Sequence, residues 1–263
     1  MRWLSLFLVL SFYLLSFRAL ASFCSENWAC AGVTEYDGSH QVWMSNKKPY
    51  PITMTLMVTT ENMQSGGGRR GDFEITRVIP GKQKIPVLNL RTVNPKKRWN
   101  YFYEFDWSVG DMYARHNDSY RYHLPFAKGK HYSLVQGYNG GYSHYGSDRY
   151  ALDFAMPVGT PVHAARKGVV IDIAEHNTIG GTSEWHTKYA NYVIVLHDDG
   201  TTGEYFHLMH KGVEVSVGQK VQVGQLLAYS GNTGFSSLPH LHFAVYRARP
   251  KGEFQSIPVK FRN

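Results

Sequence analysis

Apolar and polar residues alternate in three short segments in the second half of the chain. These segments are residues 151–156, 204–208 and 240–246. Alternation at a period of two predicts β-strands that each have one apolar side for a core. The other side carries Asp153 in the first segment, His207 in the second, and both His240 and His242 in the third. The pattern therefore predicts three strands that each offer an imidazole or a carboxylate.

The first half of the chain is also predicted to be β-structure. Segments 52–58 and 101–107 alternate in the same way, and no apolar residues recur at helical spacing over three turns. We expect a β-rich domain over residues 22–130, built as a small β-sandwich. The chain is rich in glycine and turns from Gln136 onwards, so residues 131–263 should form a second, antiparallel β domain. The fold class is therefore mainly β.

The predicted strand over residues 101–107 carries the aromatic residues Tyr101, Tyr103 and Trp107 on one side. They suit either packing within a sheet or a strip that binds carbohydrate. Aromatic residues pack in sheets far more often than they bind a ligand, so packing is favoured.

The N-terminus has the pattern of an export signal. Arg2 is followed by an almost purely apolar stretch over residues 3–17, and Ala19-Leu-Ala21 is a small-x-small cleavage site. We expect residues 1–21 to be a signal peptide that is cleaved after Ala21. An uncleaved anchor is less favoured, because fifteen residues are short for a membrane span. The prediction places the protein in the periplasm or secreted to the cell envelope of a bacterium, with no stable membrane insertion after cleavage.

The composition is that of a folded protein, with 43% hydrophobic and 18% charged residues. Cleavage would remove Arg2 and Arg18, so the formal charge would fall from +8 to +6. Positive residues are scattered along the chain, and we therefore expect no nucleic-acid partner. Cys24 and Cys30 are the two cysteines. In an oxidising compartment a Cys24–Cys30 disulfide is favoured over two free thiols.

The chemistry depends on whether the polar sides of the three strands converge. Two imidazoles and one carboxylate can hold Zn²⁺ and leave a fourth position for water, which is the arrangement of a metal-dependent hydrolase. A serine or cysteine nucleophile is not indicated, because there is no Gly-x-Ser-x-Gly motif and the cysteines lie near the N-terminus. The His-Glu-x-x-His motif of helical zinc peptidases is also absent.

Roughly residues 131–250 resemble the lysostaphin/LytM-type zinc peptidases, which cut the peptide part of bacterial peptidoglycan. The motifs that carry the resemblance are Asp153 followed by Pro157-Val-Gly-Thr-Pro-Val162, Gly168-Val-Val170, Tyr205-Phe-His-Leu208, Ser230-Gly-Asn-Thr-Gly234 and His240-Leu-His242. The resemblance implies a LytM-type antiparallel β catalytic domain (the duplicated hybrid motif) with a zinc groove. It also implies one Zn²⁺ per chain and peptidoglycan peptides as substrate.

Carried over to this chain, the zinc ligands would be His144, Asp153 and His242, with His240 and His207 as catalytic partners. His240 would act as general base on the water. His207, with Tyr205 beside it, would stabilise the tetrahedral oxyanion or protonate the leaving amine, and Tyr205 is a candidate for binding substrate.

The spacing of the first ligand departs from the family pattern. The first histidine usually stands four residues before the aspartate, where this chain has Arg149, and His144 lies nine residues before Asp153. Asp148 stands at the usual distance from His144 and competes for the ligand role. Asp153 is favoured because its distance to Pro157 fits the family and because its strand neighbours alternate.

Three functions remain open. The leading hypothesis is an exported zinc endopeptidase that acts on stem or cross-link peptides of peptidoglycan. A second is a non-catalytic LytM-type module that activates a wall amidase or binds peptidoglycan, although such modules typically lack the zinc residues. A third is a secreted peptidase for glycine-rich proteins.

Overall fold

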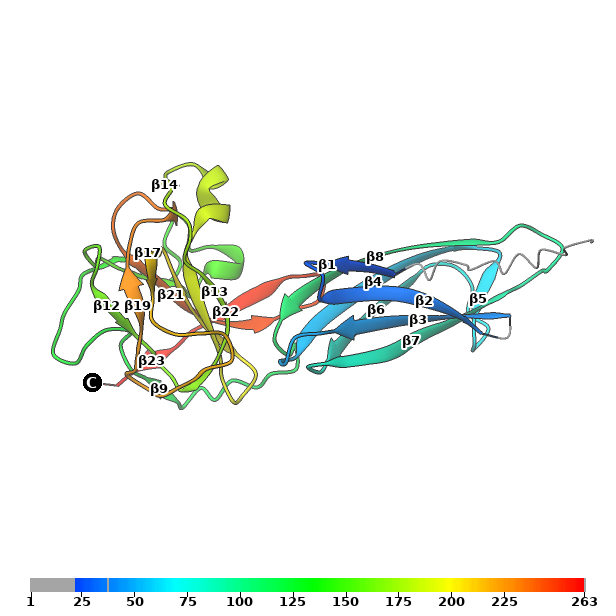
Figure 1. Cartoon of the computed structure of the whole chain (residues 1–263), viewed down its shortest axis with the longest axis horizontal. Helices are drawn as coiled ribbons and strands as arrows, with labels where there is room; N and C mark the ends of the chain where they lie inside the picture. Colours follow the sequence, from blue (N-terminus) through cyan, green and yellow to red (C-terminus); the bar gives the residue numbers. More distant parts are fainter. Residues whose placement is uncertain (1–21, 37, 263) are drawn as a thin grey trace, which may run out of the picture.

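The structure is a computed structural model that describes residues 22–36 and 38–262. It consists of two β-rich units that lie end to end (Figure 1). The expected signal peptide, residues 1–21, lies outside the described residues. No helix within the described ranges is long and apolar enough to cross a membrane. The prediction of a mainly β fold is confirmed.

The N-terminal unit contains two antiparallel sheets. The five-stranded sheet has the order β1 (Ser22–Ser25), β2 (Ala29–Tyr36), β3 (Ser39–Asn46), β7 (Gln83–Thr92), β5 (Met63–Ser65). The three-stranded sheet has the order β6 (Phe73–Ile79), β4 (Ile52–Glu61), β8 (Asn100–Val109). Both sheets contribute to one apolar core, which includes Met44 of β3 and Leu56 of β4. The aromatic side chains Tyr101, Tyr103 and Trp107 pack against this core, in agreement with the packing alternative.

A disulfide joins Cys24 and Cys30, which face each other across the β1–β2 pair. The sequence-based prediction of this bond is therefore confirmed. The bond ties a short N-terminal strand to the sheet.

The C-terminal unit is built around an eight-stranded sheet. Its strands are β10 (Leu134–Gln136), β11 (Leu152–Phe154), β21 (Leu241–Ala248), β16 (Thr202–Phe206), β15 (Tyr192–Leu196), β13 (Gly168–Ala174) and β18 (Lys220–Val221), with β22 (Phe254–Ile257) also paired to β21. A three-stranded sheet contains β12 (Pro161–His163), β19 (Leu226–Ser230) and β17 (Leu208–Val213). One apolar core includes residues of both sheets, such as Phe243 of β21 and Leu227 of β19.

Short elements complete the C-terminal unit. They are the parallel pairs β14 (Gly180–Gly181) with β20 (Gly234–Phe235) and β9 (Arg121–Tyr122) with β23 (Lys260–Phe261), and the 3₁₀ helices η1 (Gly146–Asp148) and η2 (Glu184–Tyr189). Tyr122 and Phe126 precede residue 131, where the second domain is expected to begin, and both are buried in the C-terminal core.

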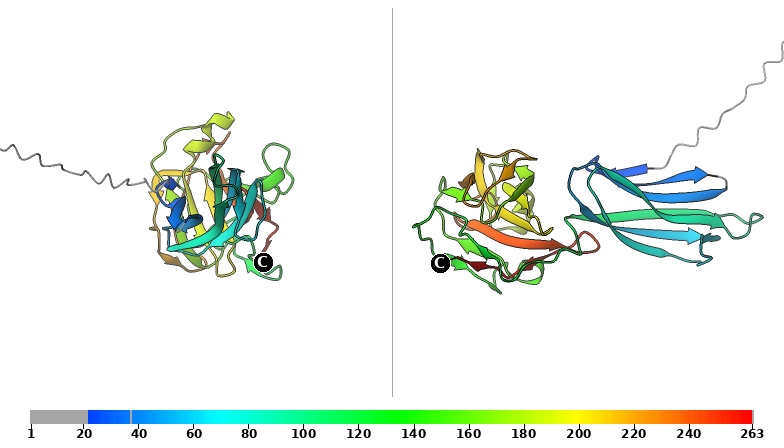
Figure 2. Two further views of the ribbon diagram at one scale, coloured as in Figure 1. Left: turned by 90° about the vertical axis from the view of Figure 1, so that its right-hand side faces the viewer. Right: turned by 90° about the horizontal axis from the view of Figure 1, so that it is seen from below.

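The turn between β21 and β22 contacts the end of the N-terminal unit. The hydroxyl of Ser108 donates to the carbonyl of Arg249 at 3.0 Å, and the backbone N–H of Lys251 donates to Thr55 at 2.8 Å. The ammonium of Lys251 lies 3.0 Å from the carboxylate of Glu74. This hairpin reaches from the C-terminal unit to the N-terminal one (Figure 2), so the two units share a specific interface.

Strand alternation places apolar side chains as the sequence predicts in two of the three segments. Leu152 and Phe154 of β11, and Leu241 and Phe243 of β21, are buried in the C-terminal core. Because side chains alternate along a strand, Asp153 and His242 lie on the opposite face of the sheet. The fold therefore presents these two polar groups on one face of adjacent strands.

Candidate active site

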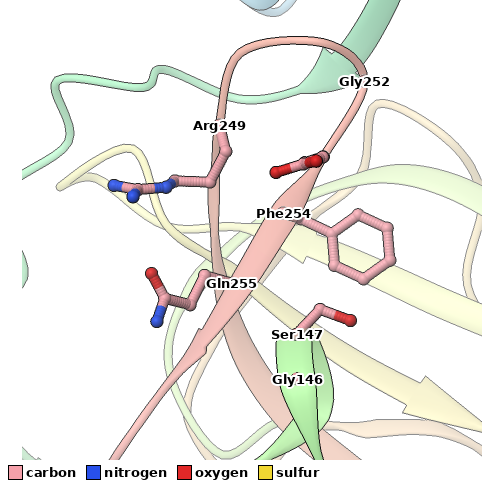
Figure 3. Close-up of a pocket in the computed structure, with 7 residues that line it drawn as sticks. Gly146, Ser147, Arg249, Gly252, Phe254 and Gln255 are labelled. Carbon is pink, nitrogen blue, oxygen red and sulfur yellow. The ribbon is translucent and has the colours of Figure 1, made fainter.

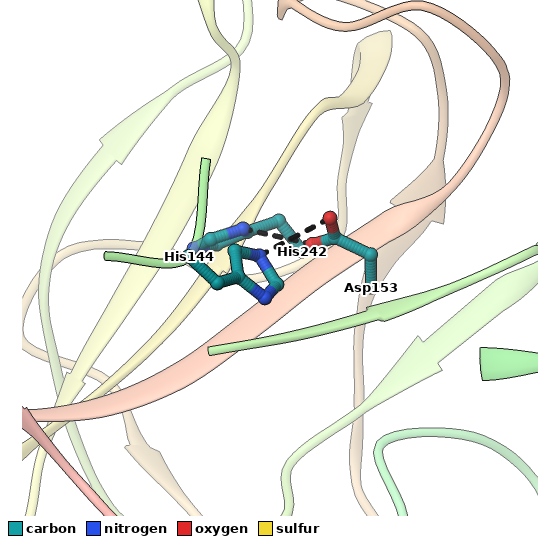
Figure 4. Close-up of side chains that lie close together, drawn as sticks. All are labelled: His144, Asp153 and His242. Carbon is teal, nitrogen blue, oxygen red and sulfur yellow. Dashed lines mark hydrogen bonds and ion pairs between the residues drawn. The ribbon is translucent and has the colours of Figure 1, made fainter. Parts of the chain in front are cut away.

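Asp153 and His242 are direct neighbours across two paired strands. Asp153 of β11 is paired with His242 of β21, and Gln136 of β10 is paired with Asp153 on its other side. His144 comes from the loop between β10 and β11 and is fully buried. Figure 4 shows the three side chains of His144, Asp153 and His242 meeting at one point.

The distances between these groups are short. Nδ1 of His242 lies 2.9 Å from Oδ1 of Asp153, and Nε2 of His144 lies 3.2 Å from Oδ2 of the same carboxylate. One potential ligand atom from each residue lies within 4.8 Å of the others. The side-chain amide of Gln136 donates to Oδ2 of Asp153 at 3.0 Å and so helps to orient the carboxylate.

The nitrogen on the far side of each imidazole has a hydrogen-bond partner of its own. A carbonyl oxygen only accepts, so Nδ1 of His144 donates to Gly137, 2.9 Å away. The hydroxyl of Tyr246 donates to Asp148 at 2.6 Å, which leaves its oxygen to accept from Nε2 of His242 at 3.4 Å. In each ring the other nitrogen faces Asp153, where it is placed to bind a metal ion.

Two imidazole nitrogens and a carboxylate thus converge on one point. Nε2 of His144 is buried and makes no hydrogen bond. A buried polar atom without a partner is costly, and a cation among the three groups would satisfy all of them. The residues present therefore fit a metal ion with nitrogen and oxygen ligands.

The electrostatics of the cluster agree with this arrangement. Burial acts to raise the pKa of Asp153, but His144 and His242 outweigh it and hold that pKa well below its usual value. Burial acts to lower the pKa of His144, and the neighbouring Asp153 more than reverses this effect. The carboxylate is therefore ionised at neutral pH, as a metal ligand must be.

Two more histidines lie beside this cluster. Nε2 of His240 is 3.8 Å from Oδ1 of Asp153, and its Nδ1 donates to the carbonyl of Leu238 at 2.7 Å. His207 donates from Nδ1 to the carbonyl of Thr233 at 2.7 Å, and the rings of His207 and His240 have centroids 4.5 Å apart. Each ring thus keeps an unprotonated Nε2.

Burial dominates the protonation of these two imidazoles. It lowers the pKa of His207 to about 3, with further lowering by His240 and His242. It also lowers the pKa of His240, although Asp153 acts in the opposite direction. Both rings are therefore neutral near pH 7 and are able to accept a proton.

Tyr205 does not lie at this site. It has no exposed surface, packs in the core against Phe243, and its hydroxyl accepts a hydrogen bond from the N–H of Ala165 at 2.8 Å. The expectation that Tyr205 binds substrate or assists His207 is therefore wrong. The reason is local: His207 has a left-handed backbone with φ of 64°, so β16 ends at Phe206 and the alternation stops there. Phe206, not Tyr205, shares the site's face with His207.

Asp148, the competitor for the ligand role, lies in η1 outside the three-residue cluster. It accepts hydrogen bonds from Tyr246 and from the hydroxyl of Ser147. Sequence reasoning missed Tyr246 and Gln136, which orient His242 and Asp153. Strand periodicity carries a signal for Tyr246, because it stands four residues after His242 on the same face of β21.

Two cavities open beside the cluster. The smaller, about 140 Å³, contains the groove around Asp153 and is lined by Val135, Gln136, Tyr142, Ser143, Asp153, His207, Phe235, Ser236, Ser237, Leu238, His240 and His242. The larger, about 230 Å³, is lined by Ser143, Asp148, Thr187, Ala190, Glu204, Phe206, His207, Phe235, His242, Tyr246 and Phe254. Every one of these described lining residues belongs to the C-terminal unit.

A separate hollow lies on the far side of Phe254, between η1 and the β21–β22 turn. Figure 3 shows Phe254 and Arg249 projecting in different directions there, above Ser147. None of the histidines of the cluster borders it.

The fold and the site together define a β domain with a candidate metal centre of two histidines and one aspartate. Residues 147–255 match the model of peptidase family M23. The C-terminal half of the chain is thus similar to M23 peptidases over these residues, and the resemblance to the lysostaphin/LytM-type peptidases is confirmed. The matched range begins after His144, so the place of His144 in the cluster rests on the geometry of the structure.

Several known proteins are similar in sequence to this half of the chain. The peptidoglycan DD-endopeptidase ShyA of Vibrio cholerae is 38% identical over 109 residues, which cover 41% of this chain and 23% of that protein. Lysostaphin of Staphylococcus simulans is 34% identical over 131 residues, covering 49% of this chain and 23% of that protein. A solved structure of the latter peptidase has 31% identity and a TM-score of 0.36, and the match covers 48% of this chain and 47% of that one. The matches thus span about a quarter of the length of both curated relatives.

Proposed function

We propose that this protein is a zinc-dependent endopeptidase that hydrolyses peptide bonds in bacterial peptidoglycan. The observation that carries the proposal is the convergence of two imidazole nitrogens and one carboxylate beside two further imidazoles, His207 and His240. The family match and the peptidoglycan endopeptidases among the relatives support the substrate class.

In this proposal His144, Asp153 and His242 hold the zinc. Two nitrogen ligands and one oxygen ligand are typical of catalytic zinc sites, which keep one position open. Bound zinc would supply Lewis-acid activation of water and of the peptide carbonyl near neutral pH.

The proposed roles of the other histidines follow from their free nitrogens. His240 is the general base, because its Nε2 faces the cluster while its Nδ1 is fixed by Leu238. Nε2 of His207 receives the proton that His240 takes from the water, and then stabilises charge on the carbonyl oxygen or passes that proton to the leaving amine, while its Nδ1 stays bonded to Thr233. A positioned acid or base of this kind contributes typically ~10²–10⁴-fold to the rate.

The non-catalytic alternative, an activator or binding module, is disfavoured in this proposal because all five candidate positions carry functional side chains. Export to the periplasm or cell envelope fits a peptidoglycan substrate and the Cys24–Cys30 disulfide. The described residues that line the two cavities all belong to the C-terminal unit, so the N-terminal unit does not border the groove. We propose that the N-terminal unit acts as a scaffold or as a wall-binding unit.

The test is digestion of purified peptidoglycan with the zinc-loaded protein, followed by mass analysis of the products. We expect new amino and carboxyl termini within the peptide part, which also identify the bond that is cut. If the zinc-loaded protein releases no peptide fragment from the peptidoglycan, the result counts against the proposal.

A further inference from the structure

The larger cavity beside His242 has a polar and an aromatic lining that the proposed hydrolysis does not use. Glu204 and Phe206 of β16 lie on the same sheet face as His242 of the neighbouring strand, since Phe206 is paired with His242 and Glu204 with Ala244. The groove and this cavity share His207 and His242 among their walls. A group in the cavity therefore lies next to the candidate metal cluster.

The cavity has an acidic lining. Its described lining includes the carboxyl groups of Glu204 and Asp148 and contains no lysine or arginine, although the chain as a whole is strongly basic. Asp172 of β13, which lies beyond β15 in the same sheet, adds a third acidic group nearby. Burial, and then these two aspartates, raise the pKa of Glu204 to about 7. The acidic groups thus lack a compensating cation in the described part of the chain.

The hydrogen bonds leave acceptor capacity free. Oε1 of Glu204 accepts from the hydroxyl of Thr202 at 2.8 Å, and no hydrogen bond to Oε2 is formed by the described residues. Asp148 accepts one bond at each oxygen, from Tyr246 and from Ser147. A carboxylate has about four acceptor positions, so both groups can still accept from a guest donor.

The rest of the lining suits an alkyl chain. Phe206, Phe235 and Phe254 supply apolar and aromatic surface, which packs against methylene groups and attracts a cation through the ring faces. The volume of about 230 Å³ is smaller than the cavities that enclose whole drug-sized ligands, and fits a single side chain.

We propose that this cavity binds a protonated primary amine, carried on a short alkyl chain by the peptide substrate next to the bond that is cut, with Glu204 and Asp148 as its acceptors. The inference rests on the proposed function, because it takes the adjoining groove to be the peptide site. It assigns Glu204 and Asp148 as residues that determine specificity for diamino-acid side chains.

The test compares two capped tripeptides, N-acetyl-Ala-Lys-Ala-amide and the same peptide with the lysine amine acetylated. Their dissociation constants are measured by calorimetric titration against the zinc-loaded full chain. We expect the free amine to bind about tenfold more tightly, as for hydrogen bonds to charged groups. Glu204→Gln keeps the acceptor for Thr202 but removes the charge, and should bring the ratio close to one. Asp148→Asn keeps the acceptor for Tyr246 and should reduce the ratio.

Glu253→Gln is the matched control, because Glu253 is exposed and lies outside this cavity. It should leave the ratio unchanged. A ratio of one in the wild type, or an unchanged ratio in both Glu204→Gln and Asp148→Asn, overturns the proposal; if Glu204→Gln does not fold, Asp148→Asn decides alone. Because binding is the readout, a protein that binds the amine but leaves peptidoglycan intact supports this assignment and counts against the endopeptidase.

Discussion

The hydroxyl of Tyr246 donates a hydrogen bond of 2.6 Å to Asp148, a residue 98 positions earlier in the chain. This bond determines which way the hydroxyl points and leaves its oxygen facing Nε2 of His242. Nε2 of His242 thereby has an acceptor of its own, and its Nδ1 faces Asp153 at 2.9 Å. Asp148, which sequence spacing presents as a possible metal ligand, thus orients the candidate ligand His242 through Tyr246.

Replacing Tyr246 by phenylalanine tests this role. We expect Tyr246→Phe to weaken zinc binding by about 10–100-fold, because partners that orient a ligating histidine contribute this much to metal affinity. Competition with a chelator of known affinity measures the effect. Tyr192→Phe is the control, since that hydroxyl donates to Asp172 instead; equal zinc affinity in the two variants would contradict the assignment.

Loss of His240 should separate catalysis from metal binding. We expect His240→Ala to lower the turnover number by about 10²–10⁴-fold, the usual contribution of a general base, while zinc content stays at that of the wild type. Zinc content and the rate of peptide hydrolysis are measured on the same preparation. His131→Ala, at an exposed position, serves as the control, and full activity in His240→Ala would sink the base assignment.

The buried imidazole of His197 should make the free energy of unfolding depend on pH. It is buried in the C-terminal unit, where burial and then Arg166 lower its pKa to about 3. The unfolded chain binds a proton at this residue below its ordinary value of 6.5, whereas the folded chain does not. The unfolded state therefore binds more protons between pH 6.5 and pH 3, so stability is highest above this range and falls as the pH falls.

The expected contribution of His197 is up to about 1.4 kcal/mol per pH unit in that window. Urea unfolding at a series of pH values should show a steeper acid loss in the wild type than in His197→Gln. The same slope in both proteins would show that the imidazole does not couple to folding.

Much of the candidate site follows from strand periodicity. The apolar residues that flank Asp153 and His242 along their strands are buried, as alternation requires. Pairing of β11 with β21 then brings the two polar groups together. Local pattern suffices here because a strand has only two faces, and a core fixes which one is buried.

Periodicity fails where the backbone leaves the strand conformation. The left-handed conformation of His207 reverses the sides expected for Tyr205 and Phe206, and no single residue type signals it. His144 lies in a loop without a period, and its orientation depends on the carbonyl of Gly137. The pKa of Glu204 is raised in part by Asp148 and Asp172, which are distant from it in sequence. These features depend on tertiary contacts, so sequence spacing does not reveal them.

The most direct test of the central claim is a crystal structure of the zinc-loaded protein with anomalous data collected at the zinc absorption edge. We predict one zinc per chain, bonded to a nitrogen of His144, a nitrogen of His242 and an oxygen of Asp153 at about 2.0–2.2 Å. A protein that takes up no zinc, or one whose zinc is held by Asp148 in place of Asp153, would contradict the account.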